Sequence, residues 1–166
     1  AGKWEEGSIQ IIHQVAKGVP FYPTGSNGFV DVRDVVRAAI QIMEHPETSG
    51  ERYIINGYNL SFKDIMTRIA VALGQKPPTI PVTDFWKTIS IGYDKVRSLL
   101  TGSEPIITRE VLSISSHPYA YNDAKLREAI GYCYLPLSQT IRDSVDAYKH
   151  SQQEGKAYGV LAATGQ

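Results

Sequence analysis

The feature that most limits the fold of this chain is its shortage of strands. Only RYIING, residues 52–57, combines β-branched and aromatic residues as a buried strand does. Helical patterns stand on both sides of it, as in proteins that alternate strands and helices. A strand needs neighbours because its backbone groups must be hydrogen-bonded. Either residues 52–56 are not a strand, or they form the edge of a sheet whose other members lie outside this sequence.

Composition is that of an ordinary globular chain of 166 residues, long enough for one domain with a core. Basic and acidic residues number 17 each, so we expect neither nucleic acid nor an anionic membrane surface as a partner. No apolar run approaches the roughly 20 residues that cross a bilayer. The single cysteine, Cys133, excludes an internal disulfide, fits a reducing, cytoplasmic compartment and is expected to be a buried structural thiol.

Periodicity predicts a helical chain with short extended segments. The helix after residue 60 has the clearest signals, because Ser61 can cap it, Asp64 completes a capping-box pair, and Gly74 can end it. The predicted helices cover 8–17, 33–44, 61–73, 83–101, 108–113, 122–130 and 138–150. Extended chain is expected at 19–23 and 29–32, a turn at 24–28, and a loose tail at 151–166. The apolar face of the second helix comprises Val35, Val36, Ala39, Ile40 and Met43.

The run Asp31-Val32-Arg33-Asp34 joins a strand pattern to a helix pattern. Asp31 can cap the helix, and Asp34 in its first turn suits the positive end of the helix dipole. Arg33 can pair with a carboxylate. The run is therefore interpreted either as a strand-to-helix junction or as a substrate or interdomain contact. A metal site would need more converging oxygens or a histidine.

Three stretches, in this order, resemble the C-terminal half of the extended short-chain dehydrogenase/reductases, specifically the NAD-dependent epimerase/dehydratases and dihydroflavonol-reductase-like enzymes. GFVDVRDVVRAA is similar to a recurring stretch of that family, and GERYIINGYNLSFKDI to its late edge strand and following helix. YNDAKLREAIGYCYLPLSQTIRDSVDAY resembles its closing segment and terminal helix. The resemblance covers about residues 1–150.

The resemblance implies an α/β fragment, mostly helical, from the substrate-binding part of a dinucleotide-binding fold. The family's Gly-rich phosphate turn, catalytic Ser/Thr and Tyr-x-x-x-Lys belong to its other half, and no G-x-G-x-x-G occurs here. We therefore expect no catalytic and no cofactor-binding residue in this chain. NAD or NADP would serve a full-length parent of roughly 300 residues, and the fragment would not bind it tightly. Residues 1–150 would form the substrate-binding region.

The substrate expected from the resemblance is a small carbonyl compound. The family's nucleotide-sugar epimerases usually have a phosphate-gripping arginine two residues before the aromatic at Phe29, whereas this chain has Asn27. That difference favours a reductase-like member. Trp4, Phe21, Tyr22 and Phe29 are predicted, with Asn27, to line the pocket, because aromatic walls with few polar groups are typical of such sites. Each aromatic could equally be ordinary packing.

Tyr121 and Lys125 match the spacing Tyr-x-x-x-Lys, in which the lysine can lower the tyrosine pKa. That chemistry needs both on one helix face, but Asn122 or Asp123 is a natural N-cap, which leaves Tyr121 outside the helix. Packing or capping is therefore the preferred interpretation, and a catalytic role is the alternative. The four histidines are dispersed and show no metal-ligand spacing.

Three functions remain open from the sequence. The first is the substrate-binding part of an NAD(P)-dependent reductase, the second a nucleotide-sugar epimerase or dehydratase of the same family. The third is a noncatalytic regulatory or scaffold module that uses the fold without chemistry. A homodimer is a further expected assembly.

Overall fold

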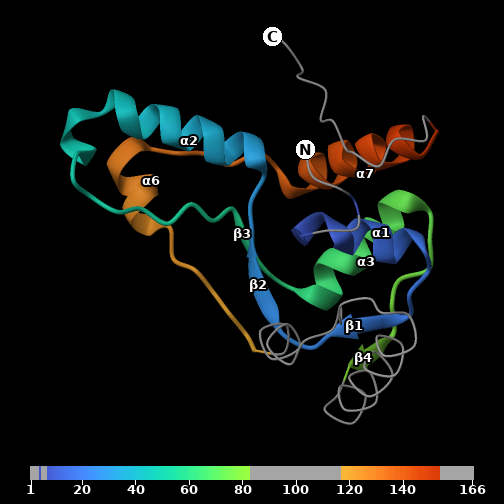
Figure 1. Ribbon diagram of the computed structural model, residues 1–166. Helices are drawn as coiled ribbons and strands as arrows, with labels where there is room; N and C mark the ends of the chain where they lie inside the picture. The colour runs from blue at the N-terminus through green and yellow to red at the C-terminus, as the bar shows by residue number, and fades with distance from the viewer. Residues whose placement is uncertain (1–3, 5–6, 83–116, 154–166) are drawn as a thin grey trace, which may run out of the picture.

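The computed structural model describes residue 4, residues 7–82 and residues 117–153, which form a mixed α/β structure made mainly of helices (Figure 1). The predicted helices at 83–101 and 108–113 and the end of the predicted tail lie outside these residues. In chain order the elements are η1 Gly7–Ile9, α1 Gln10–Ala16, β1 Phe21–Pro23, β2 Ser26–Phe29, α2 Val32–Glu44, η2 Pro46–Thr48, β3 Tyr58–Ser61, α3 Phe62–Leu73, β4 Ile80–Val82, α6 Ala124–Ile130 and α7 Leu137–Gln153.

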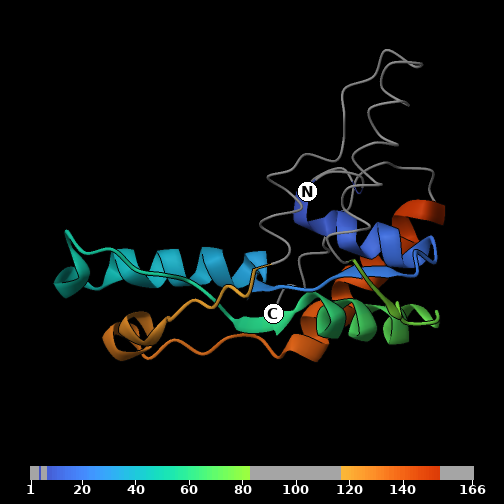
Figure 2. The same ribbon diagram turned by 90° about the horizontal axis from the view of Figure 1, so that it is seen from below.

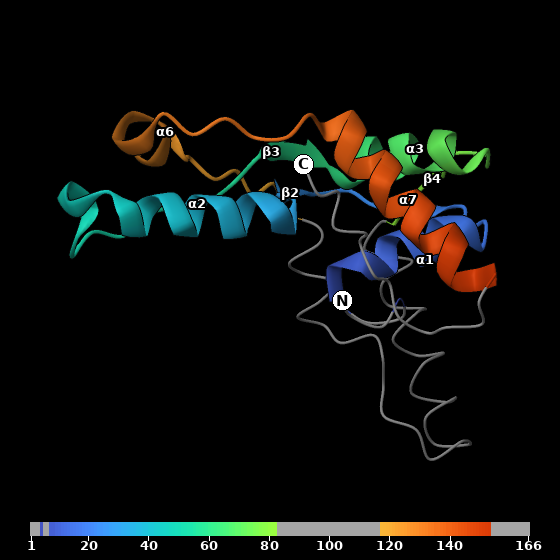
Figure 3. The same ribbon diagram turned by 90° about the horizontal axis from the view of Figure 1, so that it is seen from above.

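The larger core lies where α1, α3 and α7 pack together (Figures 1 and 3). Each helix contributes apolar residues at helical spacing, as the sequence predicts. The buried members are Trp4, Ile12, Val15, Ile65, Met66, Ile69, Ala70, Ile141, Val145 and Tyr148. The inward face predicted for the last helix is thus confirmed, although α7 continues to Gln153 and takes in the first residues of the predicted tail.

The predicted ends of α3 are confirmed. Ser61 Oγ accepts a hydrogen bond from Asp64 N at 3.0 Å, which satisfies one of the free amides at the helix start. Gly74 ends the helix with φ of +72°, a left-handed conformation that side chains disfavour. These local signals make α3 the best-predicted element of the chain.

The strands form two separate two-stranded pairs. β1 runs parallel to β4, and β2 runs antiparallel to β3. A further bridge joins Ser26 to Pro118, so the chain around residue 118 lies at the edge of β2. The β2–β3 pair lies between the three-helix core and the part of the molecule that contains α2 and α6 (Figures 1 and 2).

Residues 52–56 pair with no described strand, and the paired strand β3 begins at Tyr58. An edge strand at 52–56 whose neighbours lie outside this sequence stays a prediction. Two predictions for the chain before α2 are wrong in position. The strand expected at 29–32 lies instead at 26–29, and Asp31 and Val32 already belong to the start of α2. The turn expected at 24–28 is therefore shortened. The physical reason is the same in each case: pairing across the ladder, not local preference, decides which residues are strand.

A second, smaller core lies between α2, α6 and the chain around residues 52–56, to one side of the three-helix core (Figure 2). Its buried members are Ala38, Leu126 and Tyr132. The inner side of α2 is thus formed by Asp34, Ala38 and half-buried Ile42. The apolar face predicted for α2 lies elsewhere on the helix and is exposed: Val36 is 54% and Met43 77% accessible.

Candidate functional site

Asp31, Arg33 and Asp143 form a charged junction between α2 and α7. Asp31 caps α2 by accepting a hydrogen bond from Arg33 N at 2.9 Å. The Arg33 guanidinium donates to both Asp31 oxygens, at 3.0 and 2.7 Å. Its other terminal nitrogen lies 2.7 Å from Asp143 Oδ2 on α7. One arginine therefore joins the start of one helix to the middle of another.

The charge state of this junction follows from its contacts. Burial of Asp31 opposes ionisation, but hydrogen bonds from Arg33 and Thr140 outweigh it and hold the Asp31 pKa below its ordinary value. Asp31 is 7% exposed, so little surface remains for a ligand. The geometry agrees with the interpretation of the Asp31–Asp34 run as a strand-to-helix junction. Asp143 was not anticipated, since nothing in the sequence links it to Arg33.

Asp34, also in the first turn of α2, is hydrogen-bonded to the chain segment that leads into α7. Its carboxylate, 2% exposed, accepts a hydrogen bond from the Tyr132 hydroxyl at 2.8 Å. Leu135 N donates to both of its oxygens, at 3.3 and 3.1 Å. Burial and the hydrogen bond to Asp34 raise the pKa of Tyr132, so its hydroxyl remains a donor. A buried carboxylate with these partners has a structural role.

A polar network joins β3 to the chain at residue 121. Asn56 Nδ2 donates to Asn59 Oδ1 at 3.0 Å, and Tyr121 N donates to the same oxygen at 3.0 Å. Asn59 Nδ2 in turn donates to the Tyr121 carbonyl at 2.9 Å. Gly28 of β2 lies directly beneath this network, where a Cβ atom would meet Asn56 and Tyr121. Sequence reasoning missed this site, although two asparagines around a turn were a signal for side-chain pairing with the backbone.

The five predicted pocket residues fall in three places. Trp4 lies in the larger core, edge-on to Tyr148 with ring centroids 5.0 Å apart. Phe21 and Tyr22 are half-buried on β1, and Asn27 and Phe29 are half-buried on β2. The Lys63 ammonium lies 5.6 Å from the Tyr22 ring centroid. Their role in substrate binding remains a prediction.

Hollows lie on both sides of α7 residues that pack against α3. An inner one of about 150 Å³ lies between α1, β2, α3 and α7. Phe29 and Asp31 line it together with Tyr58 and Thr140, in a mainly apolar wall. Phe29, one of the predicted pocket residues, thus lines this hollow.

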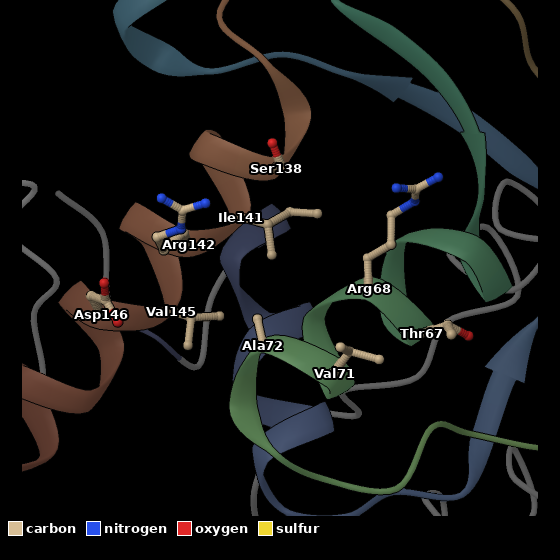
Figure 4. A pocket seen from close by; sticks show the side chains of 9 residues that line it. All are labelled: Thr67, Arg68, Val71, Ala72, Ser138, Ile141, Arg142, Val145 and Asp146. Atoms are coloured by element: carbon tan, nitrogen blue, oxygen red, sulfur yellow. The ribbon is translucent and has the colours of Figure 1, made fainter.

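The other hollow is an open groove of about 450 Å³ between α3 and α7 (Figure 4). Val71 and Ala72 face Ile141 and Val145 across it, and arginines stand on both walls (Figure 4). None of the five predicted pocket residues lines this groove.

Tyr121 and Lys125 have separate partners in the structure. Lys125 Nζ pairs with Glu51 Oε2 at 2.5 Å and lies over the Tyr53 ring. α6 begins after Tyr121, at Ala124, as the capping argument predicts. The geometry thus offers no proton-transfer pair there.

Cys133 is exposed, and the prediction of a buried thiol is wrong. The chain from 132 to 134 alternates, so that Tyr132 is buried and Tyr134 half-buried while the cysteine between them faces outward.

Within residues 4, 7–82 and 117–153, no group of three or more His, Cys, Asp or Glu side chains is placed to hold a metal ion. None of the helices described there combines the length and hydropathy of a bilayer-crossing segment.

The starts of α2 and α3 do not fit a dinucleotide phosphate. Phosphates bind where a Gly-rich turn exposes the free amides of a helix N-terminus. In each of α2 and α3 one of those amides already bonds to a side chain, Arg33 N to Asp31 and Asp64 N to Ser61, and the Asp31 carboxylate would repel a phosphate. NAD or NADP therefore has no phosphate cradle at either helix.

Known proteins similar to this chain were found by sequence and by structure. No protein-family model matches the chain. The curated "Putative dihydroflavonol 4-reductase" of Synechocystis sp. is 22% identical over 147 residues, 84% of this chain and 42% of that protein. The chain thus spans about two fifths of the length of this relative.

Solved structures show the same partial coverage. The crystal structure of gox2253 matches this chain with a TM-score of 0.63 and 26% identity. The match covers 89% of this chain and 44% of the gox2253 chain. A nucleoside-diphosphate-sugar epimerase from Pseudomonas aeruginosa has a TM-score of 0.63 and 24% identity, covering 86% of this chain and 42% of its own. Gre2 from Candida albicans has a TM-score of 0.54 and 22% identity, and the match covers 92% of this chain and 39% of the Gre2 chain.

The described fold is similar to part of the fold of these relatives. The chain is similar to part of an extended short-chain dehydrogenase/reductase of the dihydroflavonol-reductase-like type, and the resemblance found in the sequence is confirmed.

Proposed function

We propose that this chain is the substrate-binding part of an NAD(P)-dependent oxidoreductase that reduces a carbonyl compound by hydride transfer. The dinucleotide-binding sheet and the catalytic tyrosine would lie in the rest of a longer parent. The proposal is supported by the name of the Synechocystis relative, a dihydroflavonol 4-reductase. This chain would supply pocket walls and specificity, and the cofactor would supply the hydride.

The observation that carries the choice of a reductase is the environment of Asn27. Its side chain accepts a hydrogen bond from Gly28 N at 2.9 Å and carries no charge. The nearest arginine in the sequence, Arg33, is held by Asp31 and Asp143. A guanidinium that could grip a sugar diphosphate is therefore lacking on β2, which favours a substrate without phosphates.

The second candidate is a nucleotide-sugar epimerase or dehydratase, favoured by the name of the Pseudomonas neighbour. Turnover assays of the full-length parent separate the two. Oxidation of NADPH or NADH with aromatic ketones and none with UDP-sugars would support the reductase. Turnover of UDP-sugars alone would overturn it. An upstream coding sequence that holds an unrelated domain would support a noncatalytic module.

Cofactor binding gives a direct test on the chain itself. We expect calorimetric titration of these 166 residues with NADPH to show no binding in the micromolar range, because the sequence has no G-x-G-x-x-G turn and the starts of α2 and α3 offer no phosphate cradle. A dissociation constant near 1 μM, which corresponds to about 8 kcal/mol of binding free energy, would contradict the proposal that the cofactor site lies elsewhere.

A further inference from the structure

The open groove between α3 and α7 has an apolar floor and charged residues along its α7 edge. Ile141 and Val145 of α7 form the buried floor, and Val71 of α3, which is 71% exposed, faces them across the groove (Figure 4). Arg142 and Asp146 stand beside the floor on the outer side of α7. Exposed apolar surface that is rimmed by polar residues is typical of a surface that contacts another protein.

The charges on the α7 edge have no partner among the described residues. Arg142 and Asp146 are both exposed, lie one helical turn apart, and form no ion pair with any residue that the structure describes. An arginine four residues before an aspartate is the less favourable order for pairing within one helix. An occupant of the groove therefore meets a positive charge and, about 6 Å further along the helix, a negative one.

These two charges complement each other when a second α7 lies antiparallel to the first. A twofold axis at the level of Ser144 places Arg142 of each copy opposite Asp146 of the other. Lys149 then faces Gln139, so like charges do not meet along the pair. A parallel pair would instead set Arg142 against Arg142 and Asp146 against Asp146, which repel.

Val71 supplies an apolar contact in the same arrangement. It faces Ile141 and Val145, whose midpoint along α7 is close to Ser144, so the twofold axis passes near it. The two copies of Val71 would approach each other and cover both grooves. Arg68, one turn away on α3, is displaced from the axis, so its two copies do not meet. The contact thus has an apolar centre and charged pairs at its edge, the usual order in protein interfaces.

We infer that the groove between α3 and α7 is a contact surface between two copies of this chain, with their α7 helices antiparallel. A second copy is favoured over another protein as occupant because α7 itself carries the complementary charges in the required order. The inference uses only α3 and α7 and does not depend on the proposed function. Exposed ion pairs contribute little each, so we expect a weak dimer that dissociates more as salt is added.

Sedimentation equilibrium of the 166-residue chain tests the inference. We expect a monomer at nanomolar and a dimer at submillimolar concentration. Arg142→Glu alone and Asp146→Arg alone should each raise the dissociation constant about tenfold or more, because each turns two attractions into two repulsions. The double variant Arg142→Glu/Asp146→Arg restores complementary pairs and should dimerise as the wild type does. An equimolar mixture of the two single variants should form a heterodimer.

Two further variants separate this contact from other effects. Val71→Lys tests the apolar centre independently of the charges and should also dissociate the dimer. Val36→Lys, at an exposed valine on α2, is the matched control and should leave the dimer intact. Circular dichroism melts at nanomolar to low micromolar concentration, where the chain is monomeric, should be the same for all variants, which distinguishes lost pairing from lost folding.

Several outcomes would overturn the inference. One is a wild-type chain that stays monomeric at submillimolar concentration. Others are single variants that associate as strongly as the wild type, or a double variant that does not recover association. Dissociation caused by Val36→Lys but not by Val71→Lys would place the contact on α2 instead. Turnover of ketones or UDP-sugars by the longer parent would be unaffected by any of these results, so the proposed function stands or falls separately.

Discussion

At the scale of single residues, Gly28 shows how close the β2–β3 pair lies to the returning chain at 121. A Cβ atom there would stand 2.7 Å from Tyr121 Cδ2 and would overlap the Asn56 amide oxygen. We expect Gly28→Ala to lower the free energy of unfolding by about 1–3 kcal/mol, the range for an overpacked position. Urea denaturation followed by circular dichroism measures it.

The matched control is Thr24→Ala, two residues before β2 and exposed. We expect it to change the free energy of unfolding by less than about 0.5 kcal/mol. Equal stability of Gly28→Ala and wild type would mean that Asn56 and Tyr121 do not lie over β2 as described.

The stability of the folded chain depends on pH through the Asp31 carboxyl group. Its pKa in the folded chain lies below the ordinary value of 3.8, so its ionised form stabilises the fold fully above pH 3.8. This contribution is lost as the pH falls through the lower, folded-state pKa. Asp31→Asn should therefore cost about 1–3 kcal/mol at neutral pH and progressively less below pH 3.8.

Urea unfolding of both proteins across that pH range tests this. Asp146→Asn is the control, because Asp146 is exposed and has no ion pair within the described residues. A difference between wild type and Asp31→Asn that stays constant down to the lowest pH would show that the carboxylate charge is not what holds Arg33.

At the scale of elements, α2 is positioned by hydrogen bonds at its first turn as well as by its small core. Tyr132 donates to Asp34 and so ties α2 to the chain leading into α7. Tyr132→Phe leaves a carboxylate that is 2% exposed without this donor. We expect a loss of about 1–3 kcal/mol in unfolding free energy, the cost of an unsatisfied buried group.

Thermal melts of Tyr132→Phe and of Tyr119→Phe make a matched pair, since the Tyr119 side chain is exposed. Only Tyr132→Phe should have a lower melting temperature than the wild-type chain. If the two melt together, the attachment of α2 comes from apolar packing alone.

At the scale of the whole molecule, two cores of unequal size predict two levels of stability. The α2–α6 core has three buried members, whereas the α1–α3–α7 core has ten. We therefore expect α2 and α6 to open locally at a lower free energy than α3 and α7. Leu126→Ala should lower that local opening energy by about 2–5 kcal/mol and leave α3 unaffected.

Native-state hydrogen exchange resolves these openings helix by helix. Met66→Ala, in the larger core, should accelerate exchange throughout the described residues, because it lowers the global stability. Were Leu126→Ala to accelerate α3 as much as α6, the two cores would form one cooperative unit.

How much of this structure could be predicted depends on the range of the interactions involved. Ser61, Asp64 and Gly74 act within a few residues, so both ends of α3 were predicted correctly. Asp31 as the cap of α2 was found for the same reason. Asp143 as the partner of Arg33, and Asn59 as the partner of Tyr121, lie far away in sequence and could not be found. The burial of Cys133 was mispredicted because its outward direction depends on neighbours in the fold.

The sequence by itself determined the helices, their caps and the family resemblance, because each depends on local periodicity and on short motifs. Tertiary structure alone decided which residues count as strand and which helix face is covered. Both depend on a partner surface: β3 exists because β2 lies beside it, whereas residues 52–55 pair with no described strand and the exposed apolar face of α2 has no described segment against it.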